Sequence, residues 1–256
     1  MFLRRVRIIL ILLCAAVLLC GLPRSGVASK DPPFRQGEKM VYEARWGVVP
    51  AGHAVIEVLP DEAVSDVKAW HFAMTTTTNA GLDLFYKVRE RKDSFMDLSL
   101  QHTLIYKEKE EGNHPRDVIV MYDWAKGSVT RYENGNKGDT ISVPPGTIDP
   151  LGLFFYIRMN KLKPGQVLEF PVTDGKKYWN AKATVVRREQ LTISGKTQDT
   201  LLVIPDMKRL EDVFKQKDEE PDLKIWFSSD ERQVPVRIES KVIIGTFVFE
   251  LVSATF

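Results

Sequence analysis

The sequence predicts an all-β protein, an extended antiparallel sheet that curves into a half-barrel or barrel, with one apolar helix packed on it. From Gly37 onward, apolar and polar residues alternate in one short segment after another, as in 40–46 and 70–78. This period of two marks strands with one buried face. Turn-forming pairs separate the segments, as at Asn134-Gly135, Asp174-Gly175 and Ser194-Gly195. Many short strands with few helices favour a sandwich, a barrel or a strongly curved sheet.

The expected strands share this alternation or a run of β-branched and aromatic residues. In chain order they are 40–46, 53–59, 70–78, 85–90, 104–110, 118–124, 129–132, 167–172, 177–187, 201–205, 223–228 and 234–256, the last with a break near Gly245. Residues 207–222 form the most charged stretch, which Pro221 closes. We expect this stretch to be a surface excursion.

One helix is expected, over 149–162. Asp149 can cap it, Pro150 suits the first helical position, and Pro164-Gly165 ends it. Residues 151–162 have almost no polar face, so both sides of the helix should be buried. Such a helix is either a plug that closes one end of the β core, which we favour, or a lid that gates a ligand.

The N-terminus predicts a secretory signal peptide over residues 1–28. Arg4, Arg5 and Arg7 precede an uncharged apolar run over 8–19, and Gly26-Val27-Ala28 offers small residues for cleavage after about Ala28. The apolar run is short for a membrane span. We therefore expect an exported protein that resides in the periplasm, either free or associated with a membrane.

Cleavage at that site leaves residues 29–36 as a polar, flexible leader and residues 37–256 as a single β domain. Both cysteines, Cys14 and Cys20, lie in the signal peptide, so the mature chain has no thiol for a disulfide or a metal. Two alternatives stay open, lipidation at Cys20 and an uncleaved anchor. Leu19 before Cys20 is larger than a lipoprotein peptidase site normally admits, so we favour ordinary cleavage.

Charge and motifs exclude several functional classes. Cleavage would remove four arginines and change the formal net charge from +2 to −2, which gives no support for a nucleic-acid partner. The sequence contains no nucleophile elbow, zinc-protease helix or phosphate-binding loop, so we expect neither enzymatic activity nor a cofactor. His53 and His71 could converge with Glu57 on neighbouring strands, but ordinary strand histidines are the favoured interpretation, and no metal site is expected.

Aromatic residues are the stronger signal for binding. They follow the strands and the helix, where they either fill a core or line an apolar cavity on a curved sheet. The candidate ligand-binding residues are Trp46, Phe72, Phe154, Phe155 and Arg158. Arg158 is a cation within the apolar helix, whereas Lys161 lies in its last turn. It should pair with a buried carboxylate such as Glu239 or Glu43, or else hold an anionic head group in a cavity.

Three groups of residues resemble a bacterial family of exported proteins that is known only as a domain of unknown function. They are 37–42 with Pro50-Ala51-Gly52, 149–158, and 226–230 with 235–240. The resemblance spans nearly the whole mature chain and implies an envelope location, a mainly β fold and no established catalytic residue. Gly152 departs from the family pattern, which commonly has serine there, and this weakens the case for a hydroxyl role.

The leading functional hypothesis is an exported, non-catalytic binding or carrier protein for an apolar or amphipathic envelope ligand. Export, abundant strand aromatics and the lack of catalytic motifs motivate it. The alternative is an envelope scaffold or assembly factor that contacts a protein partner, for which exposed sheet edges near 118–132 would serve by strand addition. An enzyme acting on glycan or lipid comes third and would need titratable side chains that converge in one pocket.

Overall fold

The computed structural model describes residues 31–206, 223–242 and 245–256. Within them the chain forms one 14-stranded sheet, in which every strand runs antiparallel to its neighbours. The predicted signal peptide and the charged stretch 207–222 lie outside the described residues. No described helix has the length and apolar character that crossing a membrane requires.

The sheet has two limbs, which meet where the first strand pairs with the last. The first limb consists of β1 (Lys39–Trp46), β2 (Val49–Val64), β3 (Val67–Thr78), β4 (Arg89–Asp97), β5 (Thr103–Glu110), β6 (Arg116–Asp123), β7 (Ser128–Glu133) and β8 (Asn136–Ser142). The second consists of β9 (Val167–Thr173), β10 (Tyr178–Ile193), β11 (Lys196–Pro205), β12 (Leu223–Ser228), β13 (Pro235–Val242) and β14 (Gly245–Thr255). Successive strands within each limb are neighbours, so the chain forms two meanders joined by the β1–β14 pairing.

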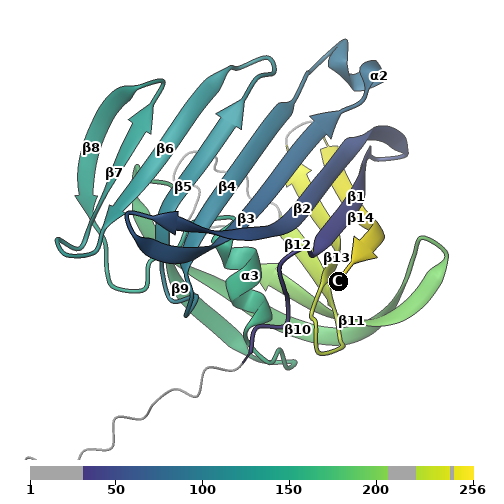
Figure 1. Cartoon of the computed structure of the whole chain (residues 1–256). Helices are drawn as coiled ribbons and strands as arrows, with labels where there is room; N and C mark the ends of the chain where they lie inside the picture. The colour runs from purple at the N-terminus through teal and green to yellow at the C-terminus, as the bar shows by residue number, and fades with distance from the viewer. Residues whose placement is uncertain (1–30, 207–222, 243–244) are drawn as a thin grey trace, which may run out of the picture. The chain divides into compact units, whose positions relative to one another are not determined.

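The two limbs curl around the connection between β8 and β9, which carries helix α3 (Gly152–Arg158). Figure 1 shows α3 inside the curl. β8 and β9 are the two edges of the sheet. A parallel bridge joins Ile148 to Val172 of β9, with the Ile148 amide 3.0 Å from the Pro171 carbonyl oxygen. The connection thus covers part of the β9 edge, and the result is the curved, barrel-like sheet that the sequence predicts.

Some predicted elements are displaced. Residues 85–88 lie in the loop after the short helix α2 (Ala80–Asp83), and the strand of this region is β4. β4 and β8 lack regular apolar alternation because charged and small polar residues occupy most of their positions. The expectation of an exposed edge near 118–132 is wrong. β6 and β7 are paired on both sides, and β8 is the edge strand of that limb.

Helix α3 is shorter than the predicted 149–162, but the side chain of Asp149 binds the backbone at its start, as the sequence predicts. Asp149 Oδ1 accepts the backbone N–H groups of Leu151 and Gly152, both at 2.8 Å. Asp149 Oδ2 accepts the hydroxyl of Ser94 on β4 at 2.5 Å and that of Thr103 on β5 at 2.7 Å. The carboxylate therefore fixes the start of the helix to the inner side of the first limb.

The end of α3 is fixed to the second limb by one amide side chain. Gln233 donates from Nε2 to the carbonyl oxygen of Arg158 at 2.8 Å and accepts from the backbone N–H of Leu162 at 2.8 Å. These bonds satisfy groups that a helix end leaves without an intrahelical partner. With both ends fixed and Phe155, Ile157 and Arg158 buried, α3 is a plug inside the curl, the alternative that the sequence favours.

Candidate functional site

The base of the concave face is a packed aromatic cluster. Phe155 of α3 stacks on Phe72 of β3 with ring centroids 3.7 Å apart and planes 12° from parallel. Phe34 packs edge-on against both rings, at 5.2 and 5.5 Å. Phe34 belongs to the segment expected to be a flexible leader, and its side chain is buried. Phe72 and Phe155 therefore cover each other's faces within the core.

Arg158 forms a buried ion pair beside this cluster. Its guanidinium nitrogens lie 2.5 and 3.2 Å from the two carboxylate oxygens of Glu38, and both side chains are 1% exposed. A buried carboxylate partner is what the sequence predicts, but the partners named, Glu239 and Glu43, are wrong. Those residues pair with Arg237 and Arg45. Glu38 precedes the first strand, and its approach to α3 depends on the tertiary fold.

The other candidate ligand residues lie apart from this pair. Trp46 is at the far end of β1, where it stacks on Phe247 of β14 at 6.3 Å and remains 38% exposed. Phe154 is half-buried at the margin of the core. The structure thus brings together Phe72, Phe155 and Arg158 but not Trp46. The assignment of these residues to ligand binding stays a prediction.

A cluster of charged side chains, which sequence reasoning did not identify, occupies the concave face above the aromatic cluster. Cross-strand neighbours share one face of a sheet, and the register pairs Lys92 with Met74 on one side and with Glu108 on the other. Lys92 Nζ lies 3.0 Å from Glu90 Oε2. Arg116 contacts Glu108 and lies 3.7 Å from Glu90. We call Glu90, Lys92, Glu108 and Arg116 the charged cluster.

Burial changes the electrostatics of the charged cluster. Desolvation raises the pKa of Glu90, and the neighbouring Glu108 adds to the increase, whereas Lys92 opposes it. Glu108 is buried although it belongs to a run of charged residues over 108–111, and such runs are usually solvated. The available signal is the period of two, which places Glu108 on the same face as the buried Tyr106.

The opposite limb presents apolar side chains to the same concave side. The register pairs Phe249 of β14 with the buried Ala44 of β1 and with Ile238 of β13. Phe249 and Ile238 are half-buried and pack at the margin of the core. Figure 1 shows the two limbs facing each other around α3. The concave side therefore has a charged wall on β4–β6 and an apolar wall on β13 and β14.

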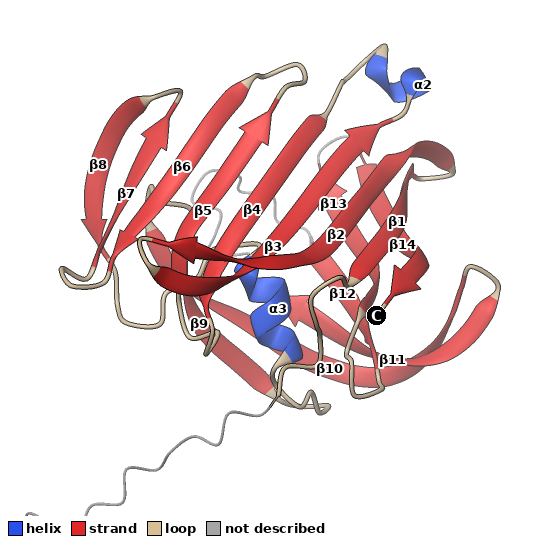
Figure 2. Ribbon diagram, in the orientation of Figure 1, coloured by secondary structure: helices blue, strands red, loops and turns tan. Residues whose placement is uncertain are grey.

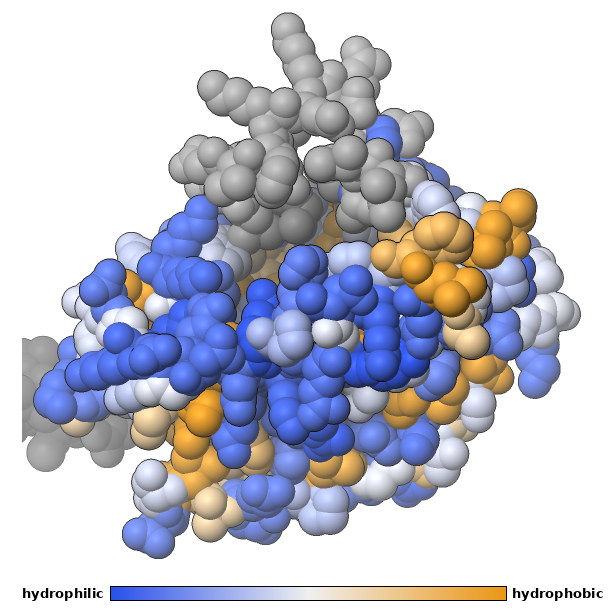
Figure 3. Space-filling view, turned by 90° about the horizontal axis from the view of Figure 1, so that it is seen from above, coloured by the Kyte–Doolittle hydropathy of each residue, from blue (hydrophilic) through white to orange (hydrophobic). Residues whose placement is uncertain are grey.

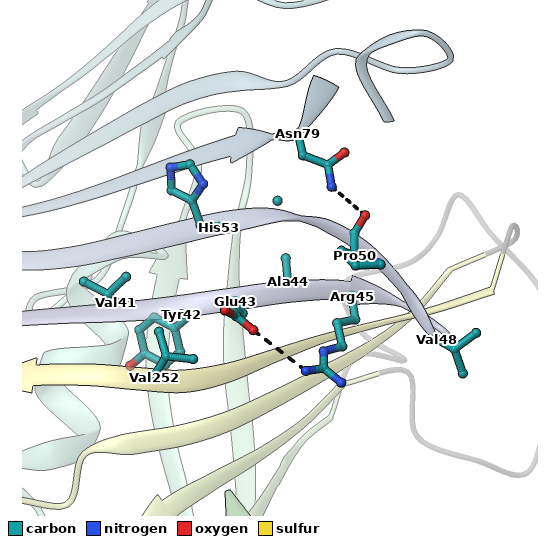
Figure 4. A pocket seen from close by; sticks show the side chains of 11 residues that line it. Val41, Tyr42, Glu43, Ala44, Arg45, Val48, Pro50, His53, Asn79 and Val252 are labelled. Carbon is teal, nitrogen blue, oxygen red and sulfur yellow. Dashed lines mark hydrogen bonds and ion pairs between the residues drawn. The ribbon is translucent and has the colours of Figure 1, made fainter. Parts of the chain in front are cut away.

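Two cavities lie beside charged side chains. One of about 380 Å³ lies where the charged cluster meets the loops, and Glu90, Arg116, Tyr86 and His114 contribute to its lining. A larger groove, of about 640 Å³, runs along β1 and β2 (Figure 4), with Glu43 and His53 among its lining residues. The side chains of Glu43, Arg45 and His53 are exposed. We favour the smaller cavity as the site because it adjoins buried charge.

The histidines do not assemble a metal site. His53 lies opposite Thr77 and His71 opposite Leu59 in the β2–β3 register, so the two imidazoles are separated along the strands. His71 instead sits between Glu62 at 2.9 Å and Asp93 at 2.8 Å. In the part of the chain that the structure describes, no group of three histidine, cysteine or acidic residues could hold a metal ion.

Comparison with solved structures agrees with the observed fold. The chain is similar to a β-barrel-like protein from Brucella abortus that carries the DUF1849 domain of unknown function, with a TM-score of 0.55 and 11% identity over 86% of this chain and 97% of that one. A second match, a candidate lipoprotein from Parabacteroides distasonis, has 11% identity over 88% of this chain and 98% of that one, with a TM-score of 0.36. At 11% identity the first match shows the fold alone.

Comparison by sequence gives the family. No curated relative matches the sequence. The DUF3108 family, described as a protein of unknown function, matches residues 41–252, a span that runs from β1 to β14 and includes α3 and the charged cluster. This result confirms the resemblance expected from the opening motif, the helix and the late strand. The chain belongs to the DUF3108 family of proteins of unknown function.

Proposed function

We propose that this protein is an exported, non-catalytic binding protein that carries an amphipathic ligand of the cell envelope on the concave side of its sheet. The observation that carries the proposal is the division of that side into a charged wall and an apolar wall. A ligand with a polar head and an apolar tail needs such a surface, because small-molecule sites combine an apolar lining with a few placed polar groups. Export to the periplasm rests on the predicted signal peptide.

The state of the carboxylates supports binding over catalysis. Glu90 and Glu108 converge beside one cavity, which is the minimum that acid–base chemistry requires. Lys92 and Arg116 hold both of them in ion pairs, so neither is a free base. Ion pairs of this kind can exchange one partner for the head group of a ligand.

Native mass spectrometry of the protein purified from the periplasm tests this proposal. We expect a co-purifying lipid or other amphipathic molecule, which organic extraction removes and which is recovered chemically unchanged. The extracted protein should then take up the fluorescent apolar probe 1-N-phenylnaphthylamine. A protein that emerges empty and takes up no probe would contradict the proposal, and conversion of the ligand would indicate an enzyme.

Two substitutions locate the site on the concave side. Arg116→Gln should weaken binding of a fluorescent fatty acid about tenfold, as loss of a charged hydrogen bond does, and Phe249→Ala should weaken binding of the neutral probe as well. The matched control is Arg188→Gln, because Arg188 also pairs with a carboxylate, that of Asp199 at 2.7 Å, but is exposed. Equal affinities for all three variants would exclude the concave side as the site.

A further inference from the structure

Two neighbouring loops at one end of the sheet expose large apolar side chains. Val48 in the β1–β2 turn is 92% exposed, and Leu84 and Phe85 in the β3–β4 loop are 83% and 82% exposed. Seen from that end, apolar side chains gather on one side of a mostly polar surface (Figure 3), the side on which the β1–β2 turn and α2 stand in Figure 1. Contiguous exposed apolar surface of this kind marks an interaction site.

The two loops are joined into one unit by the side chain and backbone of Asn79. Its Nδ2 donates to the Pro50 carbonyl oxygen at 2.6 Å, and its backbone N–H donates to that of Ala51 at 2.9 Å. Asn79 Oδ1 also accepts the backbone N–H of Leu82 at 2.9 Å. The exposed apolar side chains of the two loops, which we call the apolar tips, therefore keep a fixed spacing. We call residues 45–50 and 79–89 together the docking end.

Three backbone N–H groups of the β3–β4 loop make their hydrogen bonds within the protein. The N–H groups of Phe85 and Tyr86 both donate to the Leu82 carbonyl oxygen, at 2.9 and 2.8 Å. The N–H of Lys87 donates to Asn113 Oδ1 at 2.7 Å. Backbone groups that are satisfied internally are what entry into a lipid interface requires, because hydrocarbon offers them no partner.

The charge of the docking end is opposite in sign to that of the mature chain. It carries three basic residues, Arg45, Lys87 and Arg89, and one acidic residue, Asp83. Asp83 is paired with Arg89, with Oδ1 3.1 Å from Nη1, while Lys87 is exposed directly after the apolar tip. The half-exposed ring of Trp46 stands at the base of the β1–β2 turn, and tryptophan favours the boundary between water and lipid.

We infer that the docking end binds an anionic lipid bilayer, with Leu84, Phe85 and Val48 inserted among the acyl chains and Lys87 and Arg45 at the head groups. The tips protrude, so a protein partner would need a matching apolar pocket, whereas a bilayer accepts protruding side chains without one. The inference goes beyond the carrier function and places the molecule at the surface of a membrane.

Flotation with vesicles tests this inference, using the protein as processed by the cell that expresses it. Binding is expected to vesicles of phosphatidylethanolamine with phosphatidylglycerol and to be much weaker to vesicles of phosphatidylcholine. The double variant L84S/F85S should lower the partition coefficient at least about tenfold, because it removes two large apolar side chains from the interface. V48S/V49S should lower it by less, and Lys87→Glu should remove the preference for anionic lipid.

The matched control is Leu98→Ser, since Leu98 is also an exposed apolar residue but lies in the β4–β5 loop at the opposite end of the strands. It should bind vesicles like the unmodified protein. Urea unfolding midpoints should be unchanged for all of these exposed positions. Unmodified protein that floats with neither vesicle overturns the inference, and so does L84S/F85S that binds as well as the unmodified protein. Self-association that L84S/F85S abolishes would assign the tips to a second copy.

Brominated lipids give an independent readout of orientation. Quenching of tryptophan fluorescence by brominated acyl chains should occur on binding and should disappear in Trp46→Phe, which should still float. Quenching that persists in Trp46→Phe would place another tryptophan at the bilayer and overturn the assigned orientation. Since Phe249 pairs with Ala44 and Ile238, which lie outside the docking end, Phe249→Ala should weaken probe uptake and still bind vesicles normally, so failure of the carrier proposal and failure of docking are distinguishable.

Discussion

Glu38 and Arg158 are 120 positions apart in the sequence and form one bidentate ion pair between the start of β1 and the end of α3. The pair holds α3 against the sheet. Removing one partner leaves an uncompensated buried charge, so Arg158→Met or Glu38→Leu should each reduce the free energy of unfolding by about 3–5 kcal/mol.

The double variant Glu38→Leu with Arg158→Met should recover most of that loss, because a buried pair replaced by apolar residues of similar volume is often neutral. Urea unfolding of the four proteins forms the double-mutant cycle. If Arg158 instead served a ligand, Arg158→Met would abolish binding and leave the unfolding midpoint unchanged.

The stacking of Phe155 on Phe72 predicts that alanine substitutions of the adjacent Phe154 and Phe155 differ in their effect on stability. Phe155→Ala should cost about 3–5 kcal/mol in the free energy of unfolding, since it leaves a cavity in the aromatic cluster. Phe154→Ala should cost less because its ring is half-buried. Chemical denaturation followed by circular dichroism measures both. Equal, small losses would show that α3 is not packed as described.

The Asp149 carboxylate accepts four hydrogen bonds. We therefore predict that substitution of Asp149 by asparagine destabilises the protein less than substitution by alanine. Asp149→Ala should cost about 2–4 kcal/mol, because the Ser94 and Thr103 hydroxyls and two helical N–H groups lose their acceptor. Asp149→Asn keeps an acceptor for the N–H groups and should cost less. Asp123→Ala, which removes an exposed carboxylate that contacts Lys126, is the control and should change stability little. An Asn variant as unstable as the Ala variant would contradict this account.

The raised pKa of Glu90 predicts a pH-dependent gain in stability for Glu90→Gln. A carboxyl whose pKa is higher in the folded state ionises more readily in the unfolded chain, so the protein loses stability as pH rises above the ordinary value of about 4.5. Glutamine cannot ionise. The variant should therefore be more stable than the unmodified protein near neutral pH and equal to it in acid below that value. Urea unfolding across this range measures it, with the exposed Glu169→Gln as control, and a loss of stability at every pH would contradict the prediction.

The strands that the sequence identifies are those whose buried face is continuous. In β3, Trp70, Phe72 and Met74 share one face, and the alternation is visible without the structure. In β4 the inward positions are Glu90, Lys92, Ser94 and Met96, so three of these four positions are polar. Period-two reasoning fails there because the concave wall is charged, and this is the candidate site itself.

Pairings between distant segments were the other part that the sequence left open. The need of Arg158 for a carboxylate follows from its apolar helix, but the choice of Glu38 depends on the course of the segment before β1. Gly152 is a similar case. A Cβ there would lie 2.7 Å from Met96 Sδ and 2.9 Å from Asp149 Oδ2, so a larger residue at this position requires those side chains to shift. Spacing in one sequence does not show such a contact between distant segments.

The pairing of β1 with β14 also determines the point during synthesis at which the sheet can be completed. β14 follows the other thirteen strands of the described sheet in the sequence, and until it is synthesised β1 has a partner on only one side. An unpaired strand edge is a template for pairing with other chains. Arg35 also contacts the carbonyl oxygen of Phe256, directly after β14. Native closure therefore waits for β14, and a chain released before this strand would present an open seam to its neighbours.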